Sequence, residues 1–134
     1  MFLDHISYAV RSTDKSIDAF RPIYPIVDVY KCEDKRQNIF ITFLSDRSEK
    51  HRIELIEPIN DLSPVENILG SEDSMLYHLC YRVENFTMAE KHFLSQGFLT
   101  VTVPFHPADE PSATASHMYN ESIGLIEIIC SNEG

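Results

Sequence analysis

The chain has 134 residues, of which 43% are hydrophobic and 24% charged, and its formal net charge at pH 7 is −10. This length predicts one domain, or two small modules that share a core, and the apolar content suffices for a packed interior. The acidic balance argues against nucleic-acid binding, and the lack of any run of about 18 apolar residues argues against a membrane-spanning helix.

The first half of the chain reads as a strand, a helix and three further strands. Residues 2–10 alternate, with Tyr8 and Val10 on one face and His5 on the other, which is typical of a half-buried strand. Ser12 is expected to begin a helix, which the prolines at positions 22 and 25 end. Three strands are expected to follow, at about residues 26–32, 38–45 and 51–57.

The second half repeats this order after a connector. Residues 60–70 form the connector, which is expected to be helical from Pro64 and to close at Gly70. The later elements are expected to be a strand at 75–83, a helix at 87–96, and strands at 98–103, about 113–120 and 124–130. The segment Pro104–Pro111 contains three prolines and predicts a loop.

Each half is therefore a βαβββ module. The predicted fold class is α+β, with two such modules in tandem forming a curved mixed sheet around a cup. Residues 1–134 are expected to form a single domain, in which module 1 spans about 1–58, the connector 59–73 and module 2 about 74–131. The absence of a flexible linker favours modules that pack as one unit.

The two halves also repeat residues that bind metals. An offset of 73 residues separates His5 from His78, and the same offset separates Glu54 from Glu127. In each strand the apolar neighbours have the opposite parity, so the apolar faces are expected under the helices and these four residues in a shared concavity. Two His and two Glu related by a pseudo-twofold suit an octahedral divalent metal with two open positions.

Three cysteines stand at unrelated spacings, at positions 32, 80 and 130. Their odd number indicates reduced thiols rather than a disulfide framework or a cysteine zinc knuckle. The N-terminus shows no basic region followed by an apolar stretch, so no secretory signal is expected. Together these features predict a cytoplasmic protein.

Four short segments resemble one known family. They are LDHISYAV at 3–10, RIELIEP at 52–58, YHLCYRV at 77–83 and LIEII at 125–129. In this order and spacing they are similar to the vicinal oxygen chelate superfamily, also called the glyoxalase/bleomycin-resistance/dioxygenase fold, and most closely to its methylmalonyl-CoA epimerase-like branch. The resemblance implies paired modules around a divalent metal whose ligands are His5, Glu54, His78 and Glu127. Zn, Ni, Co, Mn and Fe(II) all suit such ligands.

The resemblance also implies a chemistry, namely a metal-dependent isomerase or epimerase. A small substrate with two neighbouring oxygens would chelate the metal, and a carboxylate would take a proton next to a carbonyl to give an enediolate. Glu127 is the first candidate for this base, because the matching Glu in related isomerases is thought to loosen from the metal. Glu54 is its pseudo-symmetric partner for the opposite face. Related proteins are often homodimers, so a homodimer is expected.

Five further residues are candidates for substrate binding. Arg52 and Arg82 share strand parity with Glu54 and His78, so they are candidates to hold a substrate carboxylate. Three further candidates lie on the strand before the Glu127 strand and would line the mouth of the site: His117, Tyr119 and Asn120.

The chain departs from the epimerase pattern, and two other functions stay open. The segment 36–43, where those enzymes carry a second carboxylate, has no acid here, and the glycine-rich loop before the penultimate strand is replaced. A coenzyme A ester is therefore not implied by these segments. The alternatives are a glyoxalase-like lyase of a small metabolite and a non-catalytic protein that binds an antibiotic or another small molecule. An extradiol dioxygenase is disfavoured, because a second Glu would occupy a position that its chemistry needs free.

Overall fold

The computed structural model describes residues 1–131, and the expected domain of residues 1–134 extends past them. The strands form a mixed eight-stranded sheet in the order β2-β3-β4-β1-β5-β8-β7-β6, which confirms the predicted fold class. The chain divides into two compact units. We call residues His5–Tyr77 the N-terminal unit, and Met1–Asp4 together with the residues from His78 onward the C-terminal unit.

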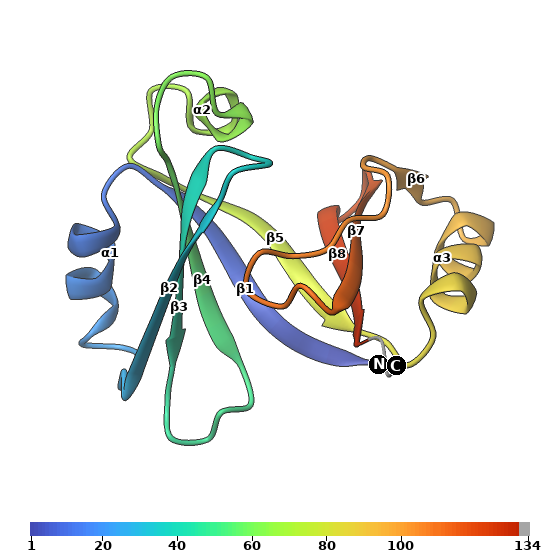
Figure 1. Cartoon of the computed structure of the whole chain (residues 1–134), viewed down its shortest axis with the longest axis horizontal. Coiled ribbons are helices and arrows are strands. Elements are labelled where there is room, and N and C mark those ends of the chain that lie inside the picture. The colour runs from blue at the N-terminus through green and yellow to red at the C-terminus, as the bar shows by residue number, and fades with distance from the viewer. Residues whose placement is uncertain (132–134) are drawn as a thin grey trace. The chain divides into compact units, whose positions relative to one another are not determined.

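The N-terminal unit holds the first module and the connector (Figure 1). Its elements are β1 (Phe2–Val10, from His5 onward), α1 (Thr13–Phe20), β2 (Asp28–Asp34), β3 (Ile39–Ser45), β4 (Arg52–Pro58) and α2 (Pro64–Leu69). β1 runs parallel to β4, β4 is antiparallel to β3, and β3 is antiparallel to β2. Ser12 caps α1 as predicted, since its side chain accepts from the backbone N–H of Lys15.

The C-terminal unit repeats this arrangement. Its elements are β5 (Ser74–Arg82, from His78 onward), α3 (Phe86–Ser95), β6 (Leu99–Thr100), β7 (Ala113–Asn120) and β8 (Gly124–Ser131). β5 runs parallel to β8, while β7 is antiparallel to both β8 and β6. The parallel pair and the two antiparallel pairs thus match those of the first module, as expected for tandem βαβββ repeats.

Two strands differ from their predicted bounds. The strand expected at 98–103 is only two residues long, because Val101 and Thr102 both donate to the carbonyl of His117 and the regular ladder ends there. The strand expected at about 26–32 begins later, at Asp28, since Ile26 instead packs against the core beneath α1.

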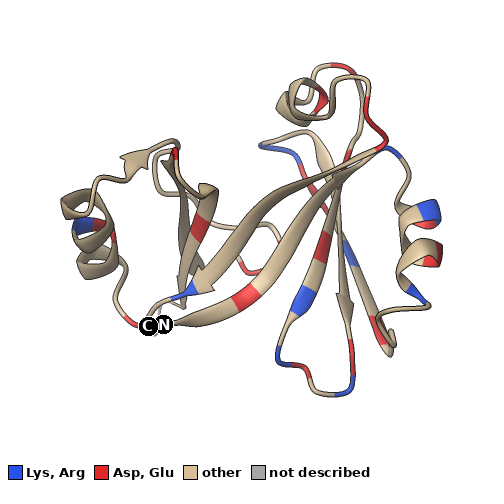
Figure 2. Cartoon of the chain, turned by 180° about the vertical axis from the view of Figure 1, so that it is seen from behind, with Lys and Arg blue, Asp and Glu red and all other residues tan. Residues whose placement is uncertain are grey.

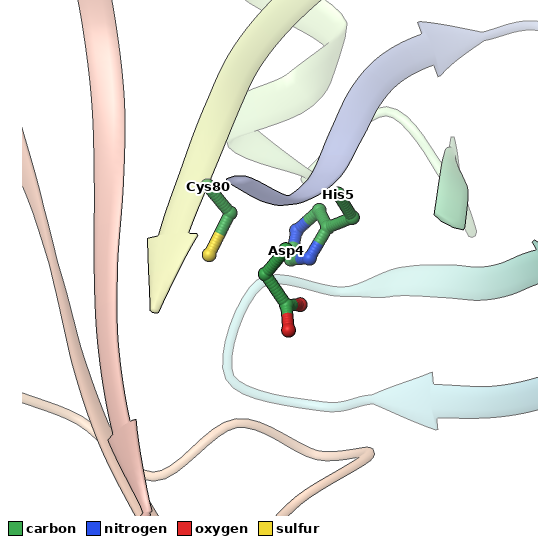
Figure 3. Close-up of side chains that lie close together, drawn as sticks. All are labelled: Asp4, His5 and Cys80. Atoms are coloured by element: carbon green, nitrogen blue, oxygen red, sulfur yellow. The ribbon is translucent and has the colours of Figure 1, made fainter. Parts of the chain in front are cut away.

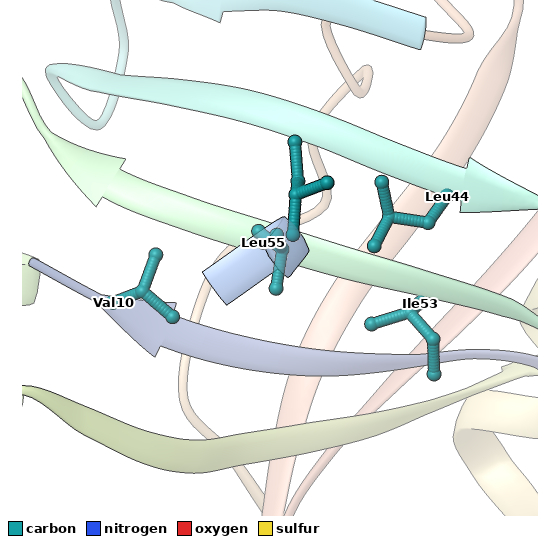
Figure 4. Close-up of a cluster of buried hydrophobic side chains, with 5 residues drawn as sticks. Val10, Leu44, Ile53 and Leu55 are labelled. Atoms are coloured by element: carbon teal, nitrogen blue, oxygen red, sulfur yellow. The ribbon is translucent and has the colours of Figure 1, made fainter. Parts of the chain in front are cut away.

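The apolar strand faces pack under the helices, as predicted. In the N-terminal unit, Val10, Leu44, Ile53 and Leu55 form a buried cluster with Ile17 of α1 (Figure 4). The equivalent cluster of the C-terminal unit contains three buried strand residues and two phenylalanines of α3: Met118, Ile126, Ile128, Phe86 and Phe93. Because side chains alternate along a strand, the residues of opposite parity lie on the other face of each sheet.

The surface carries the acidic balance of the sequence. Acidic positions occur on strands, helices and connecting loops rather than in one segment (Figure 2). Every helix within residues 1–131 is too short or too polar to cross a bilayer. The three cysteines, all within the described residues, are free thiols in this structure.

Candidate functional site

The N-terminal unit contains one buried His–Glu pair. The Nε2 atom of His5 on β1 lies 3.5 Å from Oε1 of Glu54 on β4, and both side chains are buried. Phe43 on β3 is the register partner of Glu54, and its ring meets the His5 ring edge-on with 5.2 Å between centroids. The guanidinium of Arg52 lies 4.1 Å from the centre of the Phe43 ring.

The C-terminal unit contains the corresponding pair and a second histidine. Nε2 of His78 on β5 lies 3.6 Å from Oε1 of Glu127 on β8. Nε2 of His117 on β7 lies 3.3 Å from the other carboxylate oxygen, Oε2. All three side chains are buried, and the two imidazole rings lie 5.1 Å apart. A buried carboxylate is costly unless charge or hydrogen bonds offset its desolvation, so each of these Glu residues needs its neighbours.

The strand register explains why the same pair forms in both units. Ser7 lies beside Glu54 on the parallel strand pair of the N-terminal unit, and Cys80 lies beside Glu127 in the C-terminal unit. Each histidine stands two residues before that neighbour, so it projects from the same face as the Glu. The sequence prediction that His and Glu share the face opposite the helices therefore holds within each unit.

Arg82 is held by an ion-pair network within the C-terminal unit. Its Nε donates to Asp4 at 3.0 Å, and its two terminal nitrogens donate to Glu110 at 3.0 and 2.7 Å. One of these nitrogens also donates to Ser131 at 2.6 Å. The hydrogen bonds from Arg82 lower the pKa of Glu110, and Glu110 in turn raises the pKa of Arg82 above its ordinary value. Two carboxylates thus pair with this guanidinium, and substrate binding by Arg82 stays a prediction.

The network reaches the residue before His5. Figure 3 shows Asp4 and Cys80, whose carboxylate oxygen and Sγ atom lie within 4.8 Å of one another, together with His5, the next residue along β1. Asp4 is buried despite its charge, and Arg82 supplies the compensating cation. Sequence reasoning missed Asp4 and Glu110, because nothing local marks partners that stand 78 and 28 residues from Arg82.

The remaining predicted residues lie in different settings. Tyr119 shares the parity of His117 and is 40% exposed near the edge of the sheet, where it pairs with Leu99. Asn120 has the opposite parity and accepts from the backbone of Ser122, so its side chain stabilises the turn between β7 and β8. His117 is buried and contacts Glu127, which is deeper than the mouth position expected for it.

The contact between His117 and Glu127 had a signal in the sequence. β7 and β8 form a hairpin in which Asn120 pairs with Gly124. Counting outward from that turn places His117 directly opposite Glu127. A hairpin interpretation of residues 113–131 would therefore have predicted the pair.

The donor set of each pair fits a divalent metal. Ligand atoms that share one ion at about 2.1 Å lie about 3.0–3.4 Å apart in octahedral or tetrahedral geometry. The His–Glu separations of 3.5 and 3.6 Å are close to this range. Imidazole nitrogen with carboxylate oxygen is the ligand combination of Zn, Mn, Fe(II), Co and Ni sites.

Comparisons with known proteins agree with this fold. The sequence profile of the Glyoxalase/Bleomycin resistance protein/Dioxygenase superfamily matches residues 4–115. The mitochondrial methylmalonyl-CoA epimerase of Dictyostelium discoideum is 25% identical over 95 residues, which are 70% of this chain and 56% of that protein. The matched part thus spans only a little more than half the length of this curated relative.

Two solved epimerase structures share the fold. Methylmalonyl-CoA epimerase from Mycobacterium tuberculosis superposes with a TM-score of 0.83 at 19% identity, covering 98% of this chain and 89% of that one. A variant of the Streptomyces coelicolor enzyme, in complex with 2-nitronate-propionyl-CoA, has a TM-score of 0.81 at 17% identity and covers 99% of both chains. The profile match covers most of the chain and shows that it belongs to the Glyoxalase/Bleomycin resistance protein/Dioxygenase superfamily.

Proposed function

We propose that this protein is a metal-dependent isomerase or epimerase that moves a proton next to the carbonyl of a small chelating substrate. The observation that carries the proposal is the buried His–Glu pair found at repeated positions in both units. Its relatives include epimerases named for methylmalonyl-CoA, which is an acyl thioester with an acidic carbon-bound proton. A carbonyl compound of this reactivity is the substrate class that we propose.

In this proposal four residues hold one divalent metal: His5, Glu54, His78 and Glu127. When bound, the metal supplies Lewis-acid stabilisation of negative charge on the substrate oxygens. The sequence repeat and the family membership support the shared site, since each half contributes an equivalent pair. The apolar strands around both Glu residues exclude water and strengthen their electrostatic interactions with a cation.

Glu127 takes the proton from one face of the substrate. Its carboxylate is buried between two imidazole nitrogens, and a positioned carboxylate of this kind is suited to act as a general base. Glu54 serves the opposite face as the pseudo-symmetric carboxylate. Arg52 lies on β4 with Glu54, and its guanidinium packs against the ring of Phe43 on β3. It is the candidate to bind an anionic group of the substrate.

The first test is the metal content of the purified protein by elemental mass spectrometry. The variants are His5→Ala and Glu127→Ala, and His92→Ala on exposed α3 is the matched control. About one ion per chain, lost in both site variants and kept in the control, supports the proposal. No ion after reconstitution with Zn, Ni, Co, Mn and Fe(II) would refute it. Retention in only one site variant would refute a single shared site.

The second test follows the chemistry. Candidate carbonyl compounds are incubated with the loaded protein in deuterated water, and exchange of the carbon-bound proton is followed by NMR. We expect exchange with the native chain and its loss in Glu127→Gln, which keeps the size of the side chain but removes the base. Exchange that persists in this variant would exclude Glu127 as the base. Oxygen consumption, or tight binding without turnover, would favour a different reaction class.

The oligomeric state and the location stay predictions. A homodimer would give twice the chain mass of 15.4 kDa in light scattering, and a monomer would contradict it. The relative from Dictyostelium discoideum is mitochondrial by name, whereas a cytoplasmic location is the prediction for this chain. Fluorescent tagging at the C-terminus in the native host would decide between them.

A further inference from the structure

His117 contacts the carboxylate of Glu127 from the side that His78 leaves open. Nε2 of His78 lies 3.6 Å from Oε1, whereas Nε2 of His117 lies 3.3 Å from Oε2. The two histidines therefore contact different carboxylate oxygens of Glu127. A carboxylate rotates readily about its last torsion, which has broad and roughly two-fold minima. A second contact on Oε2 restricts that rotation.

His117 is itself held in place by its surroundings. Its backbone N–H donates to Oγ1 of Thr102 at 2.9 Å, and its carbonyl accepts from the N–H of Val101 at 2.9 Å. The ring is 3% exposed and packs edge-on against Phe105, with 5.3 Å between centroids. Phe105 is fixed in turn by two backbone hydrogen bonds to Ala115, both 2.8 Å long. A side chain supported in this way can hold a partner without reorganising.

The N-terminal unit shows what this position looks like without the ring nitrogen. Phe43 is the register partner of Glu54, as His117 is of Glu127. The ring lies at a similar distance from the neighbouring histidine in both units, at 5.2 Å for Phe43 and 5.1 Å for His117, although the interplanar angles are 80° and 45°. Packing alone is therefore satisfied by a phenyl ring. The nitrogen of His117 serves the carboxylate rather than the core.

We infer that His117 is a positioning residue for Glu127. In the tautomer protonated on Nε2, it donates toward Oε2 and keeps Oε1 turned toward His78. The inference rests on the proposed function, because it assigns the orientation of a carboxylate that serves there as ligand and base. It also gives the carboxylate of Glu127 a second imidazole contact at the register position where Phe43 stands opposite Glu54.

Three variants test this inference. His117→Phe reproduces the residue of the N-terminal unit and removes the nitrogen. His117→Gln places an amide nitrogen near the position of Nε2, whereas His117→Asn offers the same group one carbon too short to reach Glu127. His92→Phe, on the exposed face of α3, is the control for a general effect of His-to-Phe substitution. Metal affinity is measured by competition with a chromogenic chelator, and thermal unfolding of the metal-free chains is recorded alongside.

We expect the metal affinity of His117→Phe to fall about 10–100-fold, as is usual when a group that orients a metal ligand is lost. His117→Gln should recover most of this loss and His117→Asn should not, while the metal-free chains unfold at similar temperatures. In turnover, kcat should fall with KM unchanged. Equal affinities for native, Gln and Asn chains would overturn the inference and leave the proposed function standing. A native chain that binds no metal would instead overturn the proposed function itself.

Discussion

Replacing either of two buried serines by Ala should change the free energy of unfolding, but in opposite directions. Ser116 on β7 is 0% exposed, and its hydroxyl has no hydrogen-bond partner among residues 1–131. Ser63 is 2% exposed, but its hydroxyl donates to the carbonyl of Gln37 at 2.9 Å and accepts from the N–H of Val65 at 3.2 Å. Replacement by Ala removes one oxygen atom in each case. The two changes therefore differ in hydrogen bonding and little in volume.

The magnitudes follow from those contacts. An unsatisfied buried polar group costs about 1–3 kcal/mol, so Ser116→Ala should raise the free energy of unfolding by about 1 kcal/mol after a small loss of packing. Ser63 is the N-cap of α2, and losing a cap together with a buried hydrogen bond costs about 1–2 kcal/mol. The two variants should therefore differ by about 2–3 kcal/mol, with the native chain between them.

Urea unfolding followed by circular dichroism measures the difference. The slope m should be the same in all three chains, because the surface exposed on unfolding hardly changes. The midpoint should move up for Ser116→Ala and down for Ser63→Ala. A Ser116→Ala chain destabilised as strongly as Ser63→Ala would show that the Ser116 hydroxyl has a partner, and the reasoning from unsatisfied burial would be wrong.

Three further changes test the core, the ion-pair network and the metal. Leu55→Ala should cost about 2–5 kcal/mol in urea unfolding because Leu55 is fully buried, while Leu62→Ala at an 85% exposed position should change stability by less than about 0.5 kcal/mol. Arg82 lowers the pKa of folded Glu110, so this stabilisation is present above the unfolded Glu pKa of about 4.3 and is lost as pH falls through the lower folded value. Glu110→Gln should reduce this loss of stability at low pH. An unchanged pH dependence would contradict the ion pair between Arg82 and Glu110 as its cause. Divalent metal at about 100 times its Kd should stabilise the native chain by about 2.7 kcal/mol, and a chelator should reverse the rise in Tm.

The fold was largely predictable because its signals are local. The alternation around Tyr8, the cap at Ser12 and the Pro64–Gly70 segment each specify an element through neighbouring residues, and the structure has those elements. The strand at 98–103 was predicted too long, because the two hydrogen bonds to the carbonyl of His117 that end it come from tertiary pairing. Strand propensity alone contains no information about these tertiary hydrogen bonds.

The candidate site was predictable in part. Strand parity correctly placed His5 with Glu54, and His78 with Glu127, on one face within each unit. Strand parity gives the direction of the Arg82 side chain but not the partners that it meets, and its role in substrate binding stays a prediction. Asp4 and Glu110, with which it pairs, come from segments that only the fold brings together. Ion pairs between distant segments follow from tertiary packing, which no short sequence pattern predicts.

The two units are alike in their His–Glu pairs but differ in the residue that stands opposite each Glu on the next strand. Both units have a His–Glu pair in the same strand register. The difference lies one strand away, where Phe43 stands opposite Glu54 and His117 stands opposite Glu127. A ring of similar size preserves the packing in both units, and only one ring carries nitrogen. The fold thus keeps its pseudo-symmetry in the core, while His117 gives the carboxylate of Glu127 an imidazole contact at the position where a phenyl ring stands opposite Glu54.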